Sequence, residues 1–367
     1  MKQGRQLREA KAKRVEKKRK ARRLKRAVVL SVEVFVFVCL LSVGYLMEKY
    51  GKFQVNLFNE GEVKFNEGVE QEHYTTIALF GGDSREGVLG AGTHADTMML
   101  VSINDNTKEI RIVSVYRDLL TKQQDGSIRK ANSAYFVGGA KDAINMLNEN
   151  FDLDIEDYIT VDFGAVVSVV DLLEGIEVDV KEDEAAEMNN HIEETARIAG
   201  QKAKKMEAGL QTLNGVETVT YARIRKNVAG GDYSRTERQR LVIHKLLEKL
   251  KAMKLTQVND IVDEVFGQVE TSLSLEEMLG LASGIFKYEL TETNGFPFKH
   301  TDGNIEGIGS VVIPIGVIDN VKELHTFLYP KSEYKVSKEA KAVAEEIEEL
   351  ICQTKEDTVQ PDEGVDN

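Results

Sequence analysis

The sequence predicts an α/β (α+β) domain with a mixed central sheet and helices on both faces, preceded by one transmembrane helix. Short apolar stretches typical of strands alternate with helical patterns over residues 75–330, an order that favours a sheet covered by helices. One apolar stretch near the N-terminus is long enough to cross a bilayer. Internal repeats are absent from the sequence, so we expect a single domain.

The N-terminal segment is strongly basic. Residues 1–26 carry 14 Lys and Arg against Glu9 and Glu16, a net charge of +12, so with −13 for the whole chain the remainder carries −25. A strongly acidic domain does not suit a nucleic-acid partner, because such binding depends on neutralising phosphates. We therefore expect no nucleic-acid partner and interpret residues 1–26 as a basic cytoplasmic tail.

Residues 27–47 form the apolar stretch. The basic residues before it predict a cytoplasmic N-terminus and an extracellular domain, anchored in the plasma membrane by a single pass. A cleavable signal peptide is the alternative, but no small-residue cleavage site follows Met47. Glu33 lies near the cytoplasmic end of the stretch, where it can snorkel to the interface or contact a partner. Cys39 and Cys352 do not form a disulfide framework.

The segments that follow differ in composition. Residues 48–74 are polar and rich in Gly and Asn, which indicates a linker or an irregular lead-in. Residues 75–330 are predicted to form the extracytoplasmic domain, and residues 331–367 a charged helix with an acidic, disordered tail. The elements expected, in order, are strands at Thr75–Phe80, Thr97–Ile103 and Glu109–Val115, a helix at Ala140–Asn150, a strand at Tyr158–Asp162, a helix at Gly164–Leu173, a strand at Ile176–Val180, a polar helical excursion on the surface at Asp183–Met206, helices around Leu255–Phe286, a strand at Val311–Ile315, and helices at Val321–Leu328 and Ser337–Cys352.

Charged side chains stand at one tip of each of the first three predicted strands. Asp83 follows the first strand, Asp96 precedes the second, and Arg117 follows the third. If these strands are neighbours, the tips meet at one edge of the sheet. Two carboxylates with phosphate oxygens commonly hold Mg²⁺, or Mn²⁺ in its place. Taken singly, each Asp more often caps a turn, so the metal interpretation depends on the arginines described next.

Outside the N-terminal tail, the densest basic run of the chain is Thr218–Arg240. Its alternation predicts a short strand over Thr218–Arg225, followed by a loop with a Gly-Gly break. Ser234 and Glu237 match a capping box, which predicts that a helix starts there.

The arginines of this run are predicted to share a polar cleft. Arg223 and Arg225 fall on one side of the predicted strand, while Arg235 and Gln239 lie on one helix face and Arg238 lies off it. Guanidinium groups beside a helix N-terminus bind phosphates well. The simpler interpretation is a solvated basic face, the usual fate of a charge run.

Several motifs over residues 75–250 resemble, in order and spacing, the LytR–CpsA–Psr family of cell-envelope phosphotransferases. They are GGDSR (81–85), ADTMMLVSIN (95–104), VSVYRD (113–118), KANSAYFVGG (130–139), GIEVDV (175–180), LNG (213–215), YARIRK (221–226) and GDYSRTERQR (231–240). The resemblance implies a membrane-anchored transferase with a catalytic domain at 75–330. Such an enzyme joins an anionic glycopolymer (teichoic acid, capsule or similar) from a polyprenyl-pyrophosphate carrier to peptidoglycan through a phosphodiester.

The resemblance also implies roles for individual residues. Asp83 and Asp96 would hold Mg²⁺ and, with Arg117, form the catalytic group, while apolar residues of the sheet and its helices would line a groove for the prenyl chain. The pyrophosphate would be bound by Arg117, Arg223, Arg225, Arg235 and Gln239. Asp118 would help to position an arginine or the acceptor. The sequence departs from the family at His94, where Arg is usual, and His94 or Arg85 is expected to take that place.

Two other classes of function stay open at this stage. The first is a regulatory protein that binds a polyprenyl lipid without turnover. The second is a hydrolase that cleaves the pyrophosphate with water as the acceptor. Metal-dependent release of polyprenyl phosphate distinguishes the first from a transferase, and product analysis with and without peptidoglycan distinguishes the second.

Overall fold

The computed structural model describes residues 45–357, except 46, 49, 52, 53, 60, 83–88, 254–260 and 262. Among the described residues, no helix is both long and apolar enough to cross a membrane. The predicted span at 27–47 lies outside the described residues except for Tyr45 and Met47, which are helical. The span and the basic tail at 1–26 therefore stay predictions.

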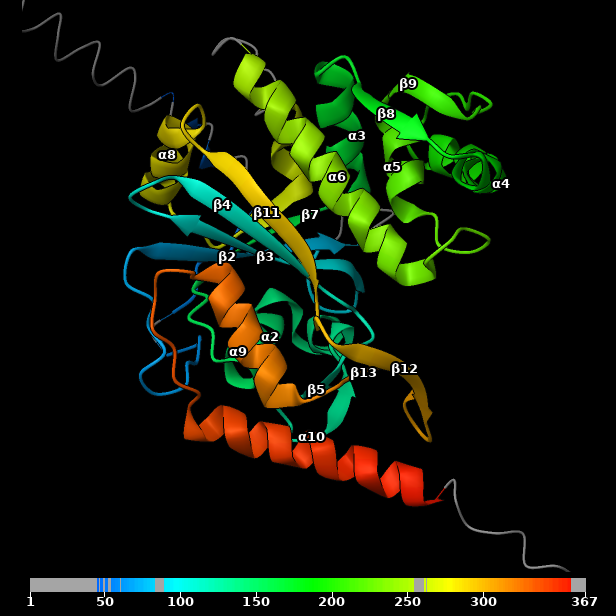
Figure 1. Ribbon diagram of the computed structural model, residues 1–367. Coiled ribbons are helices and arrows are strands. Elements are labelled where there is room, and N and C mark those ends of the chain that lie inside the picture. The colour runs from blue at the N-terminus through cyan, green and yellow to red at the C-terminus, as the bar shows by residue number, and fades with distance from the viewer. Residues whose placement is uncertain are drawn as a thin grey trace, which may run out of the picture. The chain divides into compact units, whose positions relative to one another are not determined.

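From residue 54 onward the fold is built on a seven-stranded mixed sheet (Figure 1). Its strands, in spatial order, are β1 (Gln54–Val55), β10 (Val269–Thr271), β7 (Asp157–Val161), β2 (Tyr74–Gly82), β3 (Ala95–Asn104), β4 (Glu109–Val115) and β11 (Glu289–Phe296). Strands β2, β3 and β4 are antiparallel neighbours, whereas β7 runs parallel to β2, and β11 runs parallel to β4. The predicted mixed sheet is thus confirmed, with the first three predicted strands at its centre.

Both faces of this sheet are buried, because alternate side chains of each strand point to opposite faces. On one face Leu100 and Val113 pack in the same core as α2 (Asn132–Phe151) and α9 (Val317–Leu328). On the other face Met99 and Ile112 share a core with residues of α6 (Gly231–Ala252) and α8 (Leu275–Gly284). Figure 1 shows α2 and α9 on one side of the sheet and α6 on the other. The predicted helices on both faces are confirmed.

A second apolar core forms beside the sheet. It contains residues of α3 (Phe163–Leu172), β8 (Ile176–Val180), α4 (Glu182–Ile198), β9 (Gly209–Leu213) and α5 (Gly215–Arg223). The prediction that 183–206 is a surface excursion was wrong in part, because Ala185, Met188 and Ile192 recur at helical spacing and are buried. Strand β8 pairs with β9 as a hairpin and lies outside the main sheet.

The C-terminal helix belongs to the domain. It is α10 (Lys338–Asp357), and the elements not yet named are β5 (Leu120–Lys122), β6 (Ile128–Lys130), η1 (Phe266–Gln268), β12 (His300–Ile305) and β13 (Gly309–Pro314). Ala344 and Ile347 of α10 pack with Leu120 and Val311. Buried Asp152 accepts hydrogen bonds from the backbone and hydroxyl of Ser337 just before the helix. The predicted charged helix is therefore one apolar-faced layer of the fold, and it extends five residues beyond the predicted end at 352.

The strand predicted at Thr218–Arg225 was wrong, because helix α5 covers most of it. Asn214 and Glu217 form a reciprocal capping box at the start of that helix. Gly215 lets α5 lie directly on α3, since a Cβ there would come within 2.3 Å of the Val167 carbonyl oxygen. The alternation in the sequence was misleading, because α5 is buried on almost all sides and its periodicity is weak.

The predicted start of the next helix was also wrong. Helix α6 begins at Gly231, three residues before Ser234, whose hydroxyl donates to the Gly231 carbonyl oxygen at 3.0 Å. Gly230 and Gly231 have φ angles of +79° and +52°, values that favour glycine. The predicted Gly-Gly break is confirmed and lies at the helix N-terminus itself.

Candidate active site

The strand tips meet as the sequence predicts. Because β2, β3 and β4 are antiparallel neighbours, the end of β2, the start of β3 and the end of β4 lie at one edge of the sheet. Arg117 Nη1 donates to Asp96 Oδ1 at 2.6 Å across that edge. Asp83 and Arg85, the other two residues predicted near this edge, lie outside the described residues, so their roles stay predictions.

A β-bulge directs Asp96 toward the pocket side of the sheet. Gly81 pairs with Thr97 and Gly82 with Ala95, which leaves Asp96 as the extra residue of β3. Ala95 and Met98 then point into the same core although three positions separate them. The bulge needs Gly81, because a Cβ there would lie 2.9 Å from the Thr97 Cβ.

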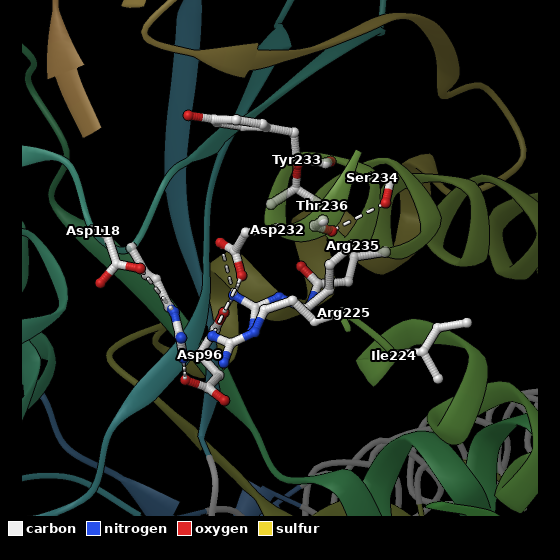
Figure 2. Close-up of polar contacts among 12 residues, drawn as sticks. Asp96, Asp118, Ile224, Arg225, Asp232, Tyr233, Ser234, Arg235 and Thr236 are labelled. Atoms are coloured by element: carbon white, nitrogen blue, oxygen red, sulfur yellow. Dashed lines mark hydrogen bonds and ion pairs between the residues drawn. The ribbon is translucent and has the colours of Figure 1, made fainter. Parts of the chain in front are cut away.

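Two arginines from the α5–α6 segment reach the same edge (Figure 2). Arg235 Nη2 donates to the Asp96 carbonyl oxygen at 3.3 Å and lies 3.1 Å from Asp232 Oδ1. Arg225 Nη1 lies 3.8 Å from the same Asp232 oxygen. Figure 2 shows Arg225, Arg235 and Asp232 gathered beside Asp96. The predicted grouping of these arginines is present, although Arg225 lies in the loop after α5 and not on a strand.

Arg223 and Gln239 complete the group. The Arg223 guanidinium lies over the Phe163 ring, 4.4 Å from its centroid, a cation–π contact that holds the planar group in place. Gln239 Nε2 donates to the Ala222 carbonyl oxygen at 3.4 Å. Both side chains therefore lie where α5 and α6 face each other, at the boundary between polar and apolar surface.

These residues line a cavity of about 250 Å³, here called the arginine pocket. Its lining residues are Asp96, Thr97, Arg117, Phe163, Glu187, His191, Arg223, Arg225, Lys226, Arg235 and Gln239. Five of these side chains are cationic and two are carboxylates, so the pocket carries net positive charge and favours an anion. Arg117, Arg223, Arg225, Arg235 and Gln239, the predicted phosphate ligands, all lie in it.

Burial affects the two deepest arginines differently. It lowers the pKa of Arg235, and the field of Asp232 only partly offsets this. For Arg117 burial also lowers the pKa, but the combined charges of Asp96, Asp232 and Asp118 outweigh it and leave the pKa above its ordinary value. Arg235 Nε is buried and has no hydrogen-bond acceptor among the residues that the structure describes.

An apolar cavity of about 350 Å³ adjoins the arginine pocket. It lies between the sheet and helices α3, α5 and α6, and among its lining residues are Met99, Val166, Val219, Val242 and Leu246. Thr97, Phe163, Arg223 and Gln239 line both cavities. A ligand with an anionic head and an apolar tail would therefore match the two cavities together.

His94 lies outside the arginine pocket, whereas Asp118 contacts Arg117, one of its lining residues. His94 is exposed and stacks on Phe136, with ring centroids 4.5 Å apart, and it does not line the arginine pocket. This placement gives no support to the prediction that His94 faces the pyrophosphate beside Arg117, because the ring covers an exposed aromatic side chain instead. Asp118 Oδ2 lies 3.5 Å from Arg117 Nε, and Lys130 Nζ lies 3.1 Å from Asp118 Oδ1. Asp118 is thus placed to orient Arg117, as predicted.

Three ionisable lining residues were not among the predicted site residues. Glu187 and His191 come from α4, and Lys226 follows Arg225 in the loop after α5. The spacing of four between Glu187 and His191, which places them on one face of a helix, was a visible signal. Treating α4 as a surface excursion hid it.

Arg238 lies outside the pocket but is not a neutral position. It is buried on α6, 3.3 Å from Glu184 Oε1, and it also donates to the Ile224 carbonyl oxygen. Arg238→Ala is expected to lower the free energy of unfolding by about 3 kcal/mol, because it leaves the Glu184 charge buried without its partner. Urea unfolding measures this, with Arg197→Ala on the exposed side of α4 as control; an unchanged midpoint for Arg238→Ala would contradict the assignment.

The fold and the pocket define an α/β domain with a cationic pocket beside an apolar cavity. The chain belongs to the LytR_cpsA_psr family, since the model of that family matches residues 43–323. The sequence-based resemblance to this family is thereby confirmed.

Several curated relatives are transferases by name. The chain is 29% identical to the polyisoprenyl-teichoic acid–peptidoglycan teichoic acid transferase TagV of Bacillus subtilis, over 59% of this chain and 54% of the relative. It is 28% identical to Biofilm regulatory protein A of Streptococcus mutans, over 68% and 64%. It is 25% identical to the transferase TagU of Bacillus licheniformis, over 79% and 94%. The chain thus spans less than two thirds of the length of the first two.

Solved structures share the fold. Protein gbs0355 from Streptococcus agalactiae matches with a TM-score of 0.62 and 24% identity, over 75% of this chain and 95% of that one. The LytR-CPS2A-psr family protein YwtF (TagT) of Bacillus subtilis, with bound octaprenyl pyrophosphate lipid, matches with a TM-score of 0.55 and 22% identity, over 74% and 99%. At these identities the likeness shows the fold.

Proposed function

We propose that this chain is a membrane-anchored, Mg²⁺-dependent phosphotransferase of the cell envelope. It transfers an anionic glycopolymer, such as teichoic acid or capsule, from a polyprenyl-pyrophosphate carrier to a peptidoglycan hydroxyl, forming a phosphodiester. The names of its transferase relatives and the lipid bound to YwtF support this class of substrate.

One observation carries the proposal: the arginine pocket and the apolar cavity share four lining residues. Polyprenyl pyrophosphate has the matching pair of parts, a doubly anionic head and a long apolar chain. Burial of that chain between the sheet and α6 would contribute about 0.8 kcal/mol per methylene group. The head group would then be held where the guanidinium groups of Arg117 and Arg235 converge.

The arginines would act mainly on the departing group. As the bond between the bridging oxygen and the sugar-linked phosphorus breaks, negative charge grows on the polyprenyl phosphate. Fixed guanidinium groups, already oriented by Asp96 and Asp232, stabilise that charge without reorganisation at the moment of reaction. Asp96 and Asp232 also hold Arg117 and Arg235 in place before the substrate binds.

Asp96 is suited to hold a metal ion. Its Oδ1 accepts from Arg117, while its Oδ2 makes no hydrogen bond with the described residues. The described residues contain no cluster of three or more His, Cys, Asp or Glu side chains fit for a metal. Mg²⁺ needs no such cluster, since one or two carboxylates with substrate phosphates suffice. Asp96, with Asp83, would hold the ion, which neutralises charge on the phosphate oxygens.

The location follows from the N-terminal sequence. We propose that residues 27–47 anchor the chain in the plasma membrane, with residues 1–26 in the cytoplasm and the domain outside. Protease added to intact protoplasts should digest the domain and spare the N-terminal tail. A domain that resists external protease but not protease added after lysis would contradict this topology.

The test of the function uses the full chain in detergent with a polyprenyl-pyrophosphate-linked glycopolymer. With Mg²⁺ and peptidoglycan present, polyprenyl phosphate should be released and the polymer should become attached to peptidoglycan. Release that is equal with and without peptidoglycan would identify a hydrolase instead. Binding without any release would favour a lipid-binding regulator, the alternative to which the name of the Streptococcus mutans relative points.

A further inference from the structure

A carboxylate–imidazole pair on α4 lies at the arginine pocket, and the proposed roles of the arginines do not use it. His191 follows Glu187 by one helical turn, and its Nε2 lies 3.1 Å from Glu187 Oε1. The side chain of Glu187 is 2% exposed, whereas that of His191 is 51% exposed. Both line the pocket, so a buried carboxylate holds an accessible imidazole at its wall.

Glu187 is kept in its charged, accepting form. Asn190 Nδ2 and Asn227 Nδ2 donate to its Oε2 at 2.9 and 3.0 Å. Burial raises the pKa of Glu187, but the hydrogen bonds from Asn227, Asn190 and His191 outweigh it and leave the pKa below its ordinary value. A carboxylate can only accept, so the Nε2 of a neutral His191 carries the proton and its Nδ1 carries the lone pair.

Each of the two carboxylates of the pocket already has a hydrogen-bond partner, and the open Oδ2 of Asp96 already has a proposed role. Asp96 accepts from Arg117 at 2.6 Å and is assigned to the metal ion above. Glu187 has hydrogen bonds on both oxygens. The Nδ1 of His191 makes no hydrogen bond within the described part of the chain. His191 is therefore the imidazole among the pocket residues that the structure describes, and its Nδ1 is open to accept a proton.

We propose that His191 is the general base of the transfer, with Glu187 as its positioning residue; this rests on the proposed function. The acceptor oxygen forms a bond to the sugar-linked phosphorus as its proton moves to His191 Nδ1. The bond from that phosphorus to the bridging oxygen breaks, and its electron pair leaves with polyprenyl phosphate. Atoms and charge balance without a further reactant.

The surrounding charges explain why the imidazole needs a carboxylate partner. The other charged side chains lining the pocket are Asp96 of β3, Arg117 after β4, Arg223 of α5, Arg225 and Lys226 of the following loop, and Arg235 of α6. Five cations oppose a new positive charge on the ring. Glu187, at 3.1 Å, offsets them at the moment when the imidazolium forms.

The experiment compares His191→Gln with the wild-type full chain, using the same lipid-linked glycopolymer and peptidoglycan. Gln can still donate to Glu187 but cannot take up a proton. His244→Gln is the matched control, because His244 lies on α6 with Glu248 one turn away and 3.9 Å distant, and it does not line the pocket. We expect kcat to fall about 100-fold in His191→Gln, with unchanged lipid binding, and to stay at the wild-type value in His244→Gln.

Two further readouts separate a base from a structural residue. The pH profile of kcat should differ between the wild type and His191→Gln, because only the wild type has a base at this position. Added imidazole should restore part of the turnover of His191→Ala, because the site is accessible. Normal kcat and an unchanged pH profile in His191→Gln would overturn this proposal alone. A wild-type chain that binds the lipid but releases no polyprenyl phosphate would overturn both this proposal and the proposed function.

Discussion

Asp96→Asn is expected to reduce Mg²⁺-dependent turnover about 1,000-fold while the domain stays folded. The amide keeps the shape of the side chain and an acceptor for Arg117, which donates to Asp96 Oδ1 at 2.6 Å. It removes the charge and replaces Oδ2, the oxygen assigned to the metal. The loss of one preorganised electrostatic contact costs about 10²–10³ in rate, and here the metal and the pairing of Arg117 are affected together.

Asp118→Asn is the matched control for this change. Asp118 also contacts Arg117, at 3.5 Å, and its side chain is as exposed as that of Asp96, 26% against 29%. It does not line the arginine pocket, so its variant should keep most of the activity. The measurement is release of polyprenyl phosphate over a range of Mg²⁺ concentrations. Equal losses in both variants would mean that Asp96 only orients Arg117. Wild-type turnover in Asp96→Asn would mean that Asp96 has no catalytic role and only caps a turn.

Arg235→Lys is expected to lower turnover about 100-fold although the charge is kept. One guanidinium nitrogen of Arg235 contacts both the Asp96 carbonyl oxygen and Asp232, and Arg235 lines the arginine pocket. An ammonium group is a point charge without this planar fork, and burial makes its charged form costly. A loss of about 2.7 kcal/mol of transition-state stabilisation corresponds to 100-fold.

Arg240→Lys separates this effect from the general cost of a buried lysine. Arg240 lies five residues later on α6, is also buried, and donates to Thr236 Oγ1 at 3.2 Å. It does not line the arginine pocket. Both variants should lose some stability in thermal unfolding, but only Arg235→Lys should lose turnover and affinity for polyprenyl pyrophosphate. If the two variants lose activity equally, the planar fork of Arg235 has no special role.

Strands of the main sheet and of the hairpin beside it could be predicted from the sequence, because the signal for them is local. Period-two alternation of apolar residues is a property of neighbouring side chains, and Glu109–Val115 and Ile176–Val180 have the predicted bounds. The same local order placed Asp96 and Arg117 at strand tips, so their meeting at one edge needed only antiparallel pairing. Chemically specific residue types also indicated the arginines that line the arginine pocket before their geometry was known.

Tertiary packing decided the rest. Thr218–Arg225 alternates like a strand, yet most of it is helical, because α5 is buried among α3, α4 and α6 and its polar face has disappeared. The side of the sheet that Asp96 faces depends on a bulge between β2 and β3, which is a property of two paired strands and has no signal in either one. Likewise, Glu187 and His191 join the pocket only because α4 packs beside α5. The residues of α5 lie about 30 positions further along the chain. The sequence by itself determined which side chains are able to bind an anion or a metal or to move a proton, since that depends on residue type. Only the folded structure decided which of them share a pocket, because contacts between distant segments come from the burial of apolar faces that no local pattern specifies.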